Sequence, residues 1–333
     1  MTLVSVIMAA RNSEKYIGQA IESVLLQTYK KFEFIIIDDA STDSTYKIIK
    51  EYKKSDKRIR IHRNKKKKGP AQSRNIAIDL SKGKWISVID SDDSFFPRKI
   101  EKQINLAKKE NNIIFIGTSL LFTDNSGRHV AYYKYKNKSN LIKNNILKNK
   151  NFPPHSSYFI SKYYLKKINS YNARYLMAPD YDLLLRLQMF KEKKFAVCEE
   201  VLTKVRIHDQ NRSLKKINNF SQLDFAILAN INFQIVKIFN IDPAKKLSNK
   251  DWEKFMRVLK LFISKLNYYK FLVNKLKYKK QKKISEYIKY FLNNYFIKSF
   301  FIGHVLPQKY QNEFIKIYKA KFDLDNKKLN NKF

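Results

Sequence analysis

The sequence predicts an α/β fold with a mainly parallel sheet flanked by helices on both faces, followed by an α-helical C-terminal region. One observation is the alternation of short apolar runs with amphipathic segments over roughly the first 117 residues. A second is that acidic clusters directly follow two of these runs. A third is the change of pattern from about residue 218 onward, where helical periodicity prevails.

The expected strands are short runs rich in Val, Ile and Phe, which are typical of strands buried on both faces of a sheet. Five of them come first, at 3–9, 32–37, 58–62, 84–89 and 113–117. The helices between them begin at capping residues, or at Pro97, which suits the first turn of a helix. These helices are expected at 13–28, 42–54, 71–80 and from 97 onward.

Beyond the fifth strand the alternation of strands and helices stops. Asp124-Asn125-Ser126-Gly127 favours a turn, so a hairpin is expected over 118–135, and one or two strands over 195–207. Helices are expected at 138–149, 180–192, 220–239, 248–269, 285–302 and 311–322. The change of period near 215 and the rise in positive charge there predict two regions, an α/β domain at 1–215 and a basic, aromatic-rich helical region at 216–333.

Composition bounds the function classes. The chain has 333 residues, one cysteine and a formal charge of +39. A single cysteine excludes a disulfide within the chain and fits a reducing compartment, and neither a signal peptide nor a spanning helix is expected. The positive charge suits an anionic membrane surface or nucleic acid. An AT-rich genome that favours Lys codons is an equally good explanation of the charge.

Two acidic clusters mark the candidate site. Asp38-Asp39 follow the second expected strand, and Asp90-Ser91-Asp92-Asp93 follow the fourth. Ligands of open α/β sheets bind at the carboxyl ends of the strands. Clustered carboxylates repel one another and lose hydration there, which a divalent metal carrying a phosphate would offset. The sequence therefore predicts a metal-assisted nucleotide site.

Seven segments, in this order, resemble the family 2 glycosyltransferases of the GT-A fold. They are Val4–Asn12, Asp38–Asp43, Ala71–Asn75, Gly83–Ile86, Asp90–Asp93 with Pro97, Pro179–Asp182, and Arg206–His208 with Asn211 and Ser213. The resemblance spans residues 3–213. It implies a Rossmann-like GT-A domain and an enzyme that transfers a sugar from a nucleotide-diphosphate sugar with inversion.

The resemblance also implies a set of donor-binding residues. Asp39 would accept a hydrogen bond from the base, typically from a uracil imide, and Ala9 and Arg11 would line the base pocket. The family often has an aromatic residue where this chain has Arg11, so the identity of the base is open. Arg74 would help to hold the nucleotide. For Asp39 the alternative is a helix cap, and for Arg74 a solvated helix position.

Asp90-Ser91-Asp92 resembles the DxD motif of the family. Alternate residues of an extended segment point the same way, so Asp90 and Asp92 can address one object. The resemblance makes Asp92 the metal ligand, with Asp90 and Ser91 on the donor, and His208 a metal or diphosphate ligand. The metal would be Mg²⁺ or Mn²⁺. A turn with a helix cap is the alternative for the acids, and a plain surface histidine for His208.

Asp180 is the candidate catalytic base, because it opens a helix in a segment that resembles the family's acidic motif. Pro179 stands where the family usually has another acid. A carboxylate at a helix start is also a plain cap, favoured by the helix dipole. Asp182 would face away and either cap the helix or pair with Arg186. His155 falls where the family often has a histidine before an acceptor-side strand, so the resemblance makes it a weaker acceptor-side candidate.

The expected activity is transfer from a UDP-sugar to a hydroxyl of a glycan or lipid-linked acceptor in bacterial surface polysaccharide or lipooligosaccharide assembly. The basic, aromatic-rich helices favour a peripheral place on the cytoplasmic face of the inner membrane. A solvated helical bundle and a protein-partner face are the alternatives for these helices. Two other function classes are a basic nucleic-acid-binding protein and a metal-dependent nucleotidyltransferase. Neither a nucleic-acid-binding motif nor a Gly-rich phosphate loop is present, so no specific nucleic acid is expected. The oligomeric state is not predicted.

Overall fold

The computed structural model describes residues 2–110, 112–209, 211, 216–217, 221–239, 242–250 and 252–253. The chain divides into two compact units, residues 1–230 and 231–333. The first unit contains every candidate site residue and is described below. The helices predicted at 285–302 and 311–322, and most of the one predicted at 248–269, lie outside the described residues.

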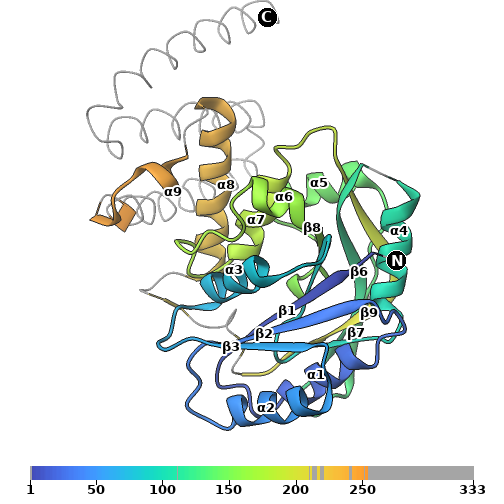
Figure 1. Ribbon diagram of the computed structural model, residues 1–333. Coiled ribbons are helices and arrows are strands. Elements are labelled where there is room, and N and C mark those ends of the chain that lie inside the picture. The colour runs from blue at the N-terminus through green and yellow to red at the C-terminus, as the bar shows by residue number, and fades with distance from the viewer. Residues whose placement is uncertain are drawn as a thin grey trace, which may run out of the picture. The chain divides into compact units, whose positions relative to one another are not determined.

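One mixed sheet forms the centre of the first unit (Figure 1). Its order is β3-β2-β1-β4-β8-β6-β9-β5, with β7 paired to β6. The strands are β1 (Val4–Ala10), β2 (Phe32–Asp38), β3 (Ile59–Arg63), β4 (Trp85–Val88), β5 (Ser94–Phe95), β6 (Ile113–Thr123), β7 (His129–Tyr133), β8 (Phe159–Ser161) and β9 (Lys194–Arg206). The first four pair in parallel, as predicted, and β8 then runs antiparallel to β4 and β6.

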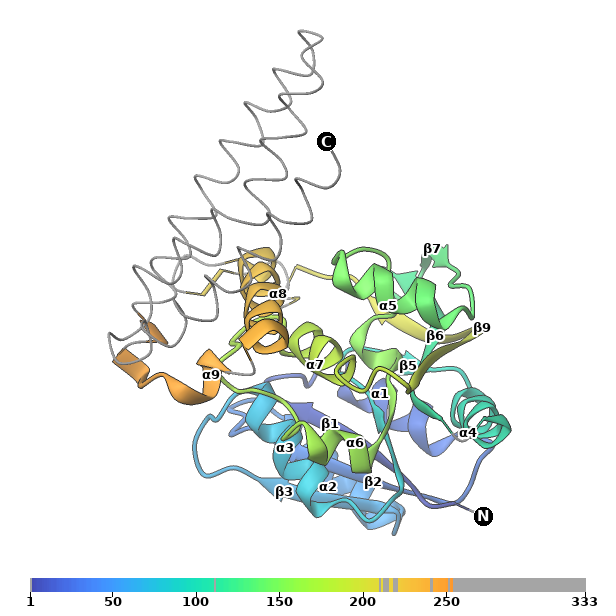
Figure 2. The same cartoon turned by 90° about the horizontal axis from the view of Figure 1, so that it is seen from above.

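Helices cover both faces of the parallel part. Those described are α1 (Ile17–Leu25), α2 (Thr45–Ser55), α3 (Pro70–Leu80), α4 (Lys99–Lys109), α5 (Ser139–Leu147), α6 (Lys162–Lys167), α7 (Pro179–Leu187), α8 (Gln222–Phe239) and α9 (Pro243–Lys246). Figure 1 shows α1 and α2 below strands β1 to β3 and α3 above them. Figures 1 and 2 both place α4 well away from α3, beside the antiparallel strands. The predicted α/β class is confirmed.

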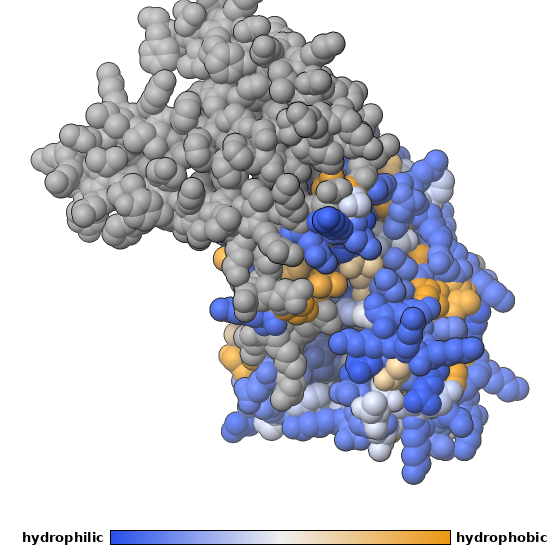
Figure 3. Space-filling model, turned by 90° about the vertical axis from the view of Figure 1, so that its left-hand side faces the viewer, coloured by the Kyte–Doolittle hydropathy of each residue, from blue (hydrophilic) through white to orange (hydrophobic). Residues whose placement is uncertain are grey.

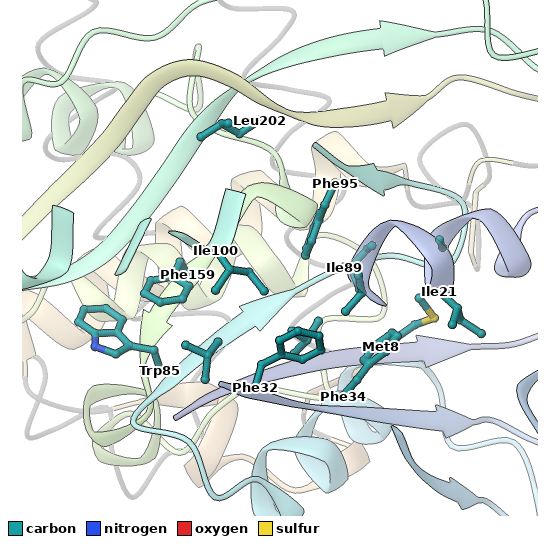
Figure 4. Close-up of a cluster of buried hydrophobic side chains, with 14 of the residues drawn as sticks. Met8, Ile21, Phe32, Phe34, Trp85, Ile89, Phe95, Ile100, Phe159 and Leu202 are labelled. Atoms are coloured by element: carbon teal, nitrogen blue, oxygen red, sulfur yellow. The ribbon is translucent and has the colours of Figure 1, made fainter. Parts of the chain in front are cut away.

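The hydrophobic core lies between the sheet and helices α1, α2 and α4 (Figure 4). Met8, Phe34 and Ile89 come from three neighbouring segments and are fully buried. Trp85 stacks on Phe159 with ring centroids 4.9 Å apart, which joins the parallel part of the sheet to β8. Burial of each such side chain stabilises the fold by about 1.5–3 kcal/mol. The candidate site therefore lies at the edge of a sheet whose strands are anchored by a buried core.

The antiparallel half of the sheet differs from the prediction in its boundaries. The predicted strand at 113–117 and the first arm of the hairpin are one continuous strand, β6. No Gly-Pro or Asx turn signal interrupts 113–123, and the strand pairs with the 13-residue β9 along its length. The turn at Asp124–Gly127 and the return strand β7 are as predicted. The short strand β5 was not predicted, because two residues carry no period.

The visible surface of the described residues is mostly hydrophilic, as expected from a sequence rich in charged residues (Figure 3). Figure 3 shows one face, on which the hydrophilic residues of the described part prevail and hydrophobic ones form small groups. The helices predicted at 138–149, 180–192 and 220–239 are confirmed as α5, α7 and α8, although α7 ends at Leu187. Among the helices of the described residues, none combines the length and apolar character needed to cross a bilayer.

Candidate functional site

The carboxyl ends of β1, β2 and β4 bring the first two predicted acidic clusters to one edge of the sheet. Ala10 at the end of β1 lies beside Asp38 at the end of β2. The next amide along, that of Asp39, donates to the carbonyl of Ala10 at 2.8 Å. Ile89 donates in turn to the carbonyl of Ile7 at 3.1 Å, which sets the segment that starts with Asp90 beside β1.

Left-handed backbone occurs in three segments of the site. Asn12, Ala40 and Ala178 have φ of 48°, 55° and 53°, although none of them is glycine. This conformation costs about 1–2 kcal/mol per non-glycine residue, and such strain gathers at functional sites. Asn12 directly follows Arg11, and Ala40 directly follows Asp39. Ala178 lies two residues before Asp180.

Asp39 is buried and holds the loop that leads into α3. Its carboxylate accepts hydrogen bonds from Asn64 Nδ2 and from the amides of Lys68 and Gly69, each at 2.8 Å. Burial raises the pKa of Asp39, but these hydrogen bonds outweigh it and leave the pKa below its usual value. One carboxylate oxygen accepts two of these bonds and the other oxygen one, so the second keeps acceptor capacity for a base. Asp39 thereby fixes the end of the basic loop 65–68 at Lys68.

The predicted base pocket is bordered by β1 and its following loop. Ala9 is the only residue of β1 that is not fully buried. The Arg11 side chain bonds the backbone of the loop after β2. Its Nη1 donates to the carbonyls of Asp39 and Ala40 at 2.7 and 3.0 Å. Ser91 Oγ lies 2.8 Å from Ser13 Oγ, so the β1 and β4 loops are bonded to each other.

Asp90 is held by two nitrogen-bearing side chains. Arg74 Nη2 donates to its Oδ1 at 2.7 Å, and His155 Nδ1 lies 3.0 and 3.1 Å from its two oxygens. The amide of Asp90 donates to Ser156 Oγ at 3.0 Å. Burial raises the pKa of Asp90, but His155 and Arg74 hold it well below its usual range. Asp90 is therefore a fixed anion.

Asp92 faces the loop after β9. His208 Nε2 lies 2.9 Å from Asp92 Oδ2, and Asn211 Nδ2 lies 3.4 Å from the same oxygen. The His208 ring also packs against Tyr16, with centroids 5.0 Å apart. Burial, followed by the charge of Asp90, raises the pKa of Asp92 above its usual value. The structure thus brings together the two residues predicted to hold a metal.

The remaining acid of the cluster, Asp93, has a structural role. Its buried carboxylate accepts from the amide of Arg206 at 2.9 Å and from Ser156 Oγ. The Arg206 side chain donates to the carbonyl of Asp92 at 3.2 Å and to Gln19 Oε1 at 2.7 Å. These contacts attach the acidic segment to β9. The sequence motif contains Arg206, yet only the fold shows that it supports Asp92.

Asp180 is the second residue of α7 and is partly exposed. Its negative charge reaches the donor side of the site. Burial is the main cause of the raised pKa of Tyr158, and the charge of Asp180 adds to it. The same charge adds to the raised pKa of Arg74, against burial and after Asp90 and Tyr171. Asp182 instead bonds Arg186 at 2.6 Å, as predicted.

His155 has contacts that its predicted acceptor-side role did not include. It is buried, and its Nε2 lies 2.8 Å from the hydroxyl of Tyr171 while Nδ1 faces Asp90. Both ring nitrogens are therefore used inside the protein. The sequence does not indicate that Tyr171 contacts His155. The two residues are 16 positions apart, and Tyr171 lies in a loop, so only the folded chain brings them together.

The side chains at this edge of the sheet include two possible ligands of a divalent cation, Asp92 and His208. Within the described residues, no group of three or more His, Cys, Asp or Glu is arranged as a metal site. Asp92 and His208 nevertheless supply an oxygen and a nitrogen side by side, and burial, followed by the charge of Asp90, raises the pKa of Asp92. A cation that keeps waters and diphosphate oxygens needs only one or two protein carboxylates, so this pair fits it.

Comparison with known proteins agrees with this geometry. A family model described as Glycosyl transferase family 2 matches residues 5–169. The "Uncharacterized glycosyltransferase MJ1057" of Methanocaldococcus jannaschii is 35% identical over 218 residues, which cover 65% of this chain and 74% of that protein. The "UDP-Glc:alpha-D-GlcNAc-diphosphoundecaprenol beta-1,3-glucosyltransferase WfgD" of Escherichia coli is 38% identical over 149 residues, 44% of this chain and 56% of that enzyme. Some other relatives are much longer, and this chain spans 21% of one of them.

Solved structures share the fold. The structure described as "S. aureus TarS 1-349 in complex with UDP-GlcNAc" superposes with a TM-score of 0.56 at 16% sequence identity, covering 78% of this chain and 79% of that one. The mixed sheet flanked by helices is that of GT-A glycosyltransferases. On its similarity to the Methanocaldococcus protein and to the family model, this chain is a member of glycosyltransferase family 2.

Proposed function

We propose that this glycosyltransferase moves a sugar from a UDP-sugar to a hydroxyl of a glycan or lipid-linked acceptor, with inversion at the anomeric carbon and with Mg²⁺ or Mn²⁺. The observation that carries the proposal is the convergence of Asp39, Asp90 and Asp92 on one sheet edge, with His208 against Asp92. Each has a different set of partners, which suits a donor with a base, a ribose and a diphosphate.

Support for a UDP-sugar comes from two sources. The TarS structures that share the fold are described as complexes with UDP and with UDP-GlcNAc, and the name of WfgD specifies UDP-Glc. In this chain, one oxygen of the Asp39 carboxylate accepts only the Gly69 amide among the bonds described above, and Asp39 directly follows the end of β2, which pairs with β1. A carboxylate there selects a base that presents an N–H, as uracil does.

The metal would be held by Asp92 and His208. A divalent cation in this position neutralises charge that develops on the leaving diphosphate. Asp90 is bonded to Arg74 and His155, so it would contact the donor ribose rather than the cation. Arg206 keeps the backbone of Asp92 in place through its carbonyl.

Asp180 would act as the base. As the acceptor oxygen attacks the anomeric carbon, its hydroxyl proton passes to the Asp180 carboxylate. The bond between that carbon and the diphosphate oxygen breaks, and its electron pair leaves with the nucleoside diphosphate. A single base opposite the leaving group gives inversion, and it needs hydrogen-bond reach to the hydroxyl.

The acceptor side of the proposal is a hydroxyl on a glycan or lipid-linked sugar in surface polysaccharide or lipooligosaccharide assembly. The name of WfgD, which specifies a sugar on diphosphoundecaprenol, supports this class of acceptor. A peripheral place at the cytoplasmic face of the inner membrane would give access to it, and the charge of +39 favours an anionic surface.

The test compares UDP binding with and without Mn²⁺ by calorimetry, in the wild type and in Asp92→Asn. We expect Mn²⁺ to strengthen UDP binding to the wild type and to have little effect on Asp92→Asn. The control is Asp79→Asn, because Asp79 is exposed and forms its ion pair with the surface residue Lys166. Equal enhancement by Mn²⁺ in the wild type and in Asp92→Asn would refute the metal role. No binding of UDP to the wild type would refute the donor.

A further inference from the structure

A chain of side-chain contacts joins the donor edge to the segment that leads into α7. Arg74 and His155 both contact Asp90, and His155 contacts the Tyr171 hydroxyl through its other nitrogen. Tyr171 belongs to the segment 168–178, which precedes Asp180. One end of this series of contacts is Asp90, the predicted donor contact, and the other is Tyr171, nine residues before the predicted base Asp180.

Helix α3 also contacts the segment 168–178 directly. The Asn75 side chain bonds both backbone groups of Tyr171, donating to its carbonyl at 2.8 Å and accepting from its amide at 2.9 Å. The neighbouring Arg74 lies over the Tyr171 ring, 5.7 Å from its centroid. Two consecutive residues of α3 thus bond the two partners of His155: Arg74 bonds Asp90, and Asn75 bonds the backbone of Tyr171.

The partners of His155 fix its tautomer. Its ring is buried, as is the Tyr171 hydroxyl, which donates its proton only if Nε2 is an acceptor. An ionised carboxylate can only accept, so Nδ1 must carry a proton to bond Asp90. Both conditions are met by the neutral imidazole protonated at Nδ1, and the hydrogen bond at one nitrogen sets the state of the other.

We infer that His155 is a positioning residue, neutral and protonated at Nδ1, that couples the orientation of Asp90 to the segment carrying Asp180. It touches neither sugar nor diphosphate. It acts through Asp90 on the donor and through Tyr171 on the base. The part played on the donor rests on the proposed function, whereas the tautomer and the coupling rest on the contacts alone.

The first test is free of activity. In protein labelled with ¹⁵N-histidine, His155 should give the Nδ1–H tautomer at pH 7.5, with a ring proton that exchanges slowly because the site is buried. His155→Asn identifies the signal by its loss. Tyr171→Phe, which keeps the ring and removes only the hydroxyl, should leave the tautomer and speed the exchange of the ring proton. An Nε2–H tautomer, a doubly protonated ring or unchanged exchange in Tyr171→Phe would overturn the inference.

The second test separates donor binding from transfer. His155→Leu removes both contacts, so KM for the nucleotide sugar should rise about tenfold and kcat should fall. His155→Asn places an amide N–H near the Nδ1 position, so it should restore KM while kcat stays about tenfold low, the effect of one lost hydrogen bond. UDP-glucose and UDP-GlcNAc are the donors used, with UDP release as the readout.

The control and the outcomes separate the two proposals. Tyr163→Phe removes the hydroxyl of an exposed tyrosine on α6 and should match the wild type. A His155→Asn variant with the same KM as His155→Leu would refute positioning. If the wild type releases no UDP from either donor, the proposed function fails, and the NMR test still decides the tautomer and the coupling.

Discussion

Asp90 and Asp92 stand two residues apart and yet have opposite electrostatic environments. His155 and Arg74 hold the pKa of Asp90 well below its usual range despite burial. Burial and the charge of Asp90 raise the pKa of Asp92. Neighbouring acids whose pKa values are pushed apart commonly have different roles. Asp90 suits a permanent hydrogen-bond acceptor, and Asp92 suits a ligand that gains from a cation.

The role of Asp180 is tested by removing its charge while keeping its shape. Asp180→Asn should bind UDP about as tightly as the wild type, because the residues proposed to contact the nucleotide, Asp39, Asp90 and Arg74, stay unchanged. Transfer should fall by roughly 10²–10⁴-fold, the usual contribution of general acid–base catalysis. Single-turnover transfer and UDP calorimetry measure the two effects. Transfer within a few fold of the wild type would place the base elsewhere.

A second residue-scale prediction concerns Lys99, a fully buried lysine of α4. Its ammonium nitrogen donates to two uncharged oxygens, Ser87 Oγ at 3.2 Å and Gln103 Oε1 at 3.1 Å. Burial lowers its pKa well below the usual value, and nearby Cys198 opposes this only in part. Between the folded pKa and the unfolded one of about 10.4, the unfolded chain binds more protons, so rising pH favours the folded state.

We therefore expect the wild type to gain stability relative to Lys99→Met as the pH rises from 6 to 9.5. Urea unfolding of both proteins at several pH values measures this difference. Lys109→Met is the matched control, because Lys109 is an exposed lysine in the last turn of the same helix. A stability difference between Lys99→Met and the wild type that does not change with pH would show that Lys99 is protonated in the folded protein throughout.

The candidate acids could be predicted from the sequence because each follows a strand or opens a helix. Their partners could not be predicted in the same way. Asn64 and Tyr171 come from loops and Ser156 from a short 3-10 helix, and their contacts depend on how distant segments meet. The contact between Asp92 and His208 joins residues 116 positions apart, and only the family resemblance indicated it.

At the scale of elements, a close approach of two segments fixes the start of β4. The amide of Gly83 donates to Ser5 Oγ at 2.8 Å, and Ser5 in turn donates to the buried Glu33 at 2.7 Å. A Cβ on Gly83 would lie 2.5 Å from the backbone nitrogen of Ser5. Since Ser5 is in β1, neither backbone can move without disturbing the parallel pairing.

Gly83→Ala should therefore destabilise the protein by about 1–3 kcal/mol, as overpacking of a tight core usually does. Gly18→Ala is the control, because a Cβ there meets only the Tyr52 ring and hydroxyl at 3.4 Å or more. In helix α1 that change should be neutral or stabilise by about 0.5–1 kcal/mol. Denaturant unfolding compares the two variants. An equal effect of both substitutions would contradict the close approach.

Elements differ in how far the sequence predicts them. The parallel strands β1 to β4 and their helices follow a clear alternation, and their boundaries agree to within a few residues. Strand β6 continues past its expected end because its partner β9 extends beside it, which is a tertiary effect. Strand β8 has three residues, too few for any period, although its place between β4 and β6 completes the sheet.

At the scale of the whole molecule, the fold class follows from periodicity, whereas the order of strands does not. The alternation of strands and helices requires a parallel sheet, and the pairing of β3, β2, β1 and β4 is parallel. The insertion of β8 between β4 and β6 reverses the direction of the chain. This reversal brings His155, just before β8, beside Asp90, just after β4, which is why the site depends on the mixed topology.

The charge of the whole chain gives the last prediction. A net charge of +39 should attract the protein to anionic bilayers, with each basic residue near the surface contributing about 1 kcal/mol. We expect it to sediment with vesicles that contain phosphatidylglycerol and not with vesicles of phosphatidylcholine alone. Raising the salt should weaken the binding, because the Debye length falls from about 8 Å at physiological ionic strength to about 3 Å at 1 M.

Nucleic acid is the competing partner for such a charge, and the same assay separates the two. If the membrane is the partner, added duplex DNA should release little protein from the vesicles at physiological salt, where nonspecific DNA binding has a Kd of about 10⁻⁴–10⁻⁶ M. Complete transfer of the protein to DNA under these conditions would favour the nucleic-acid function. Equal binding to anionic and zwitterionic vesicles would show that charge does not drive the association, because only the anionic surface offers a partner for the lysines.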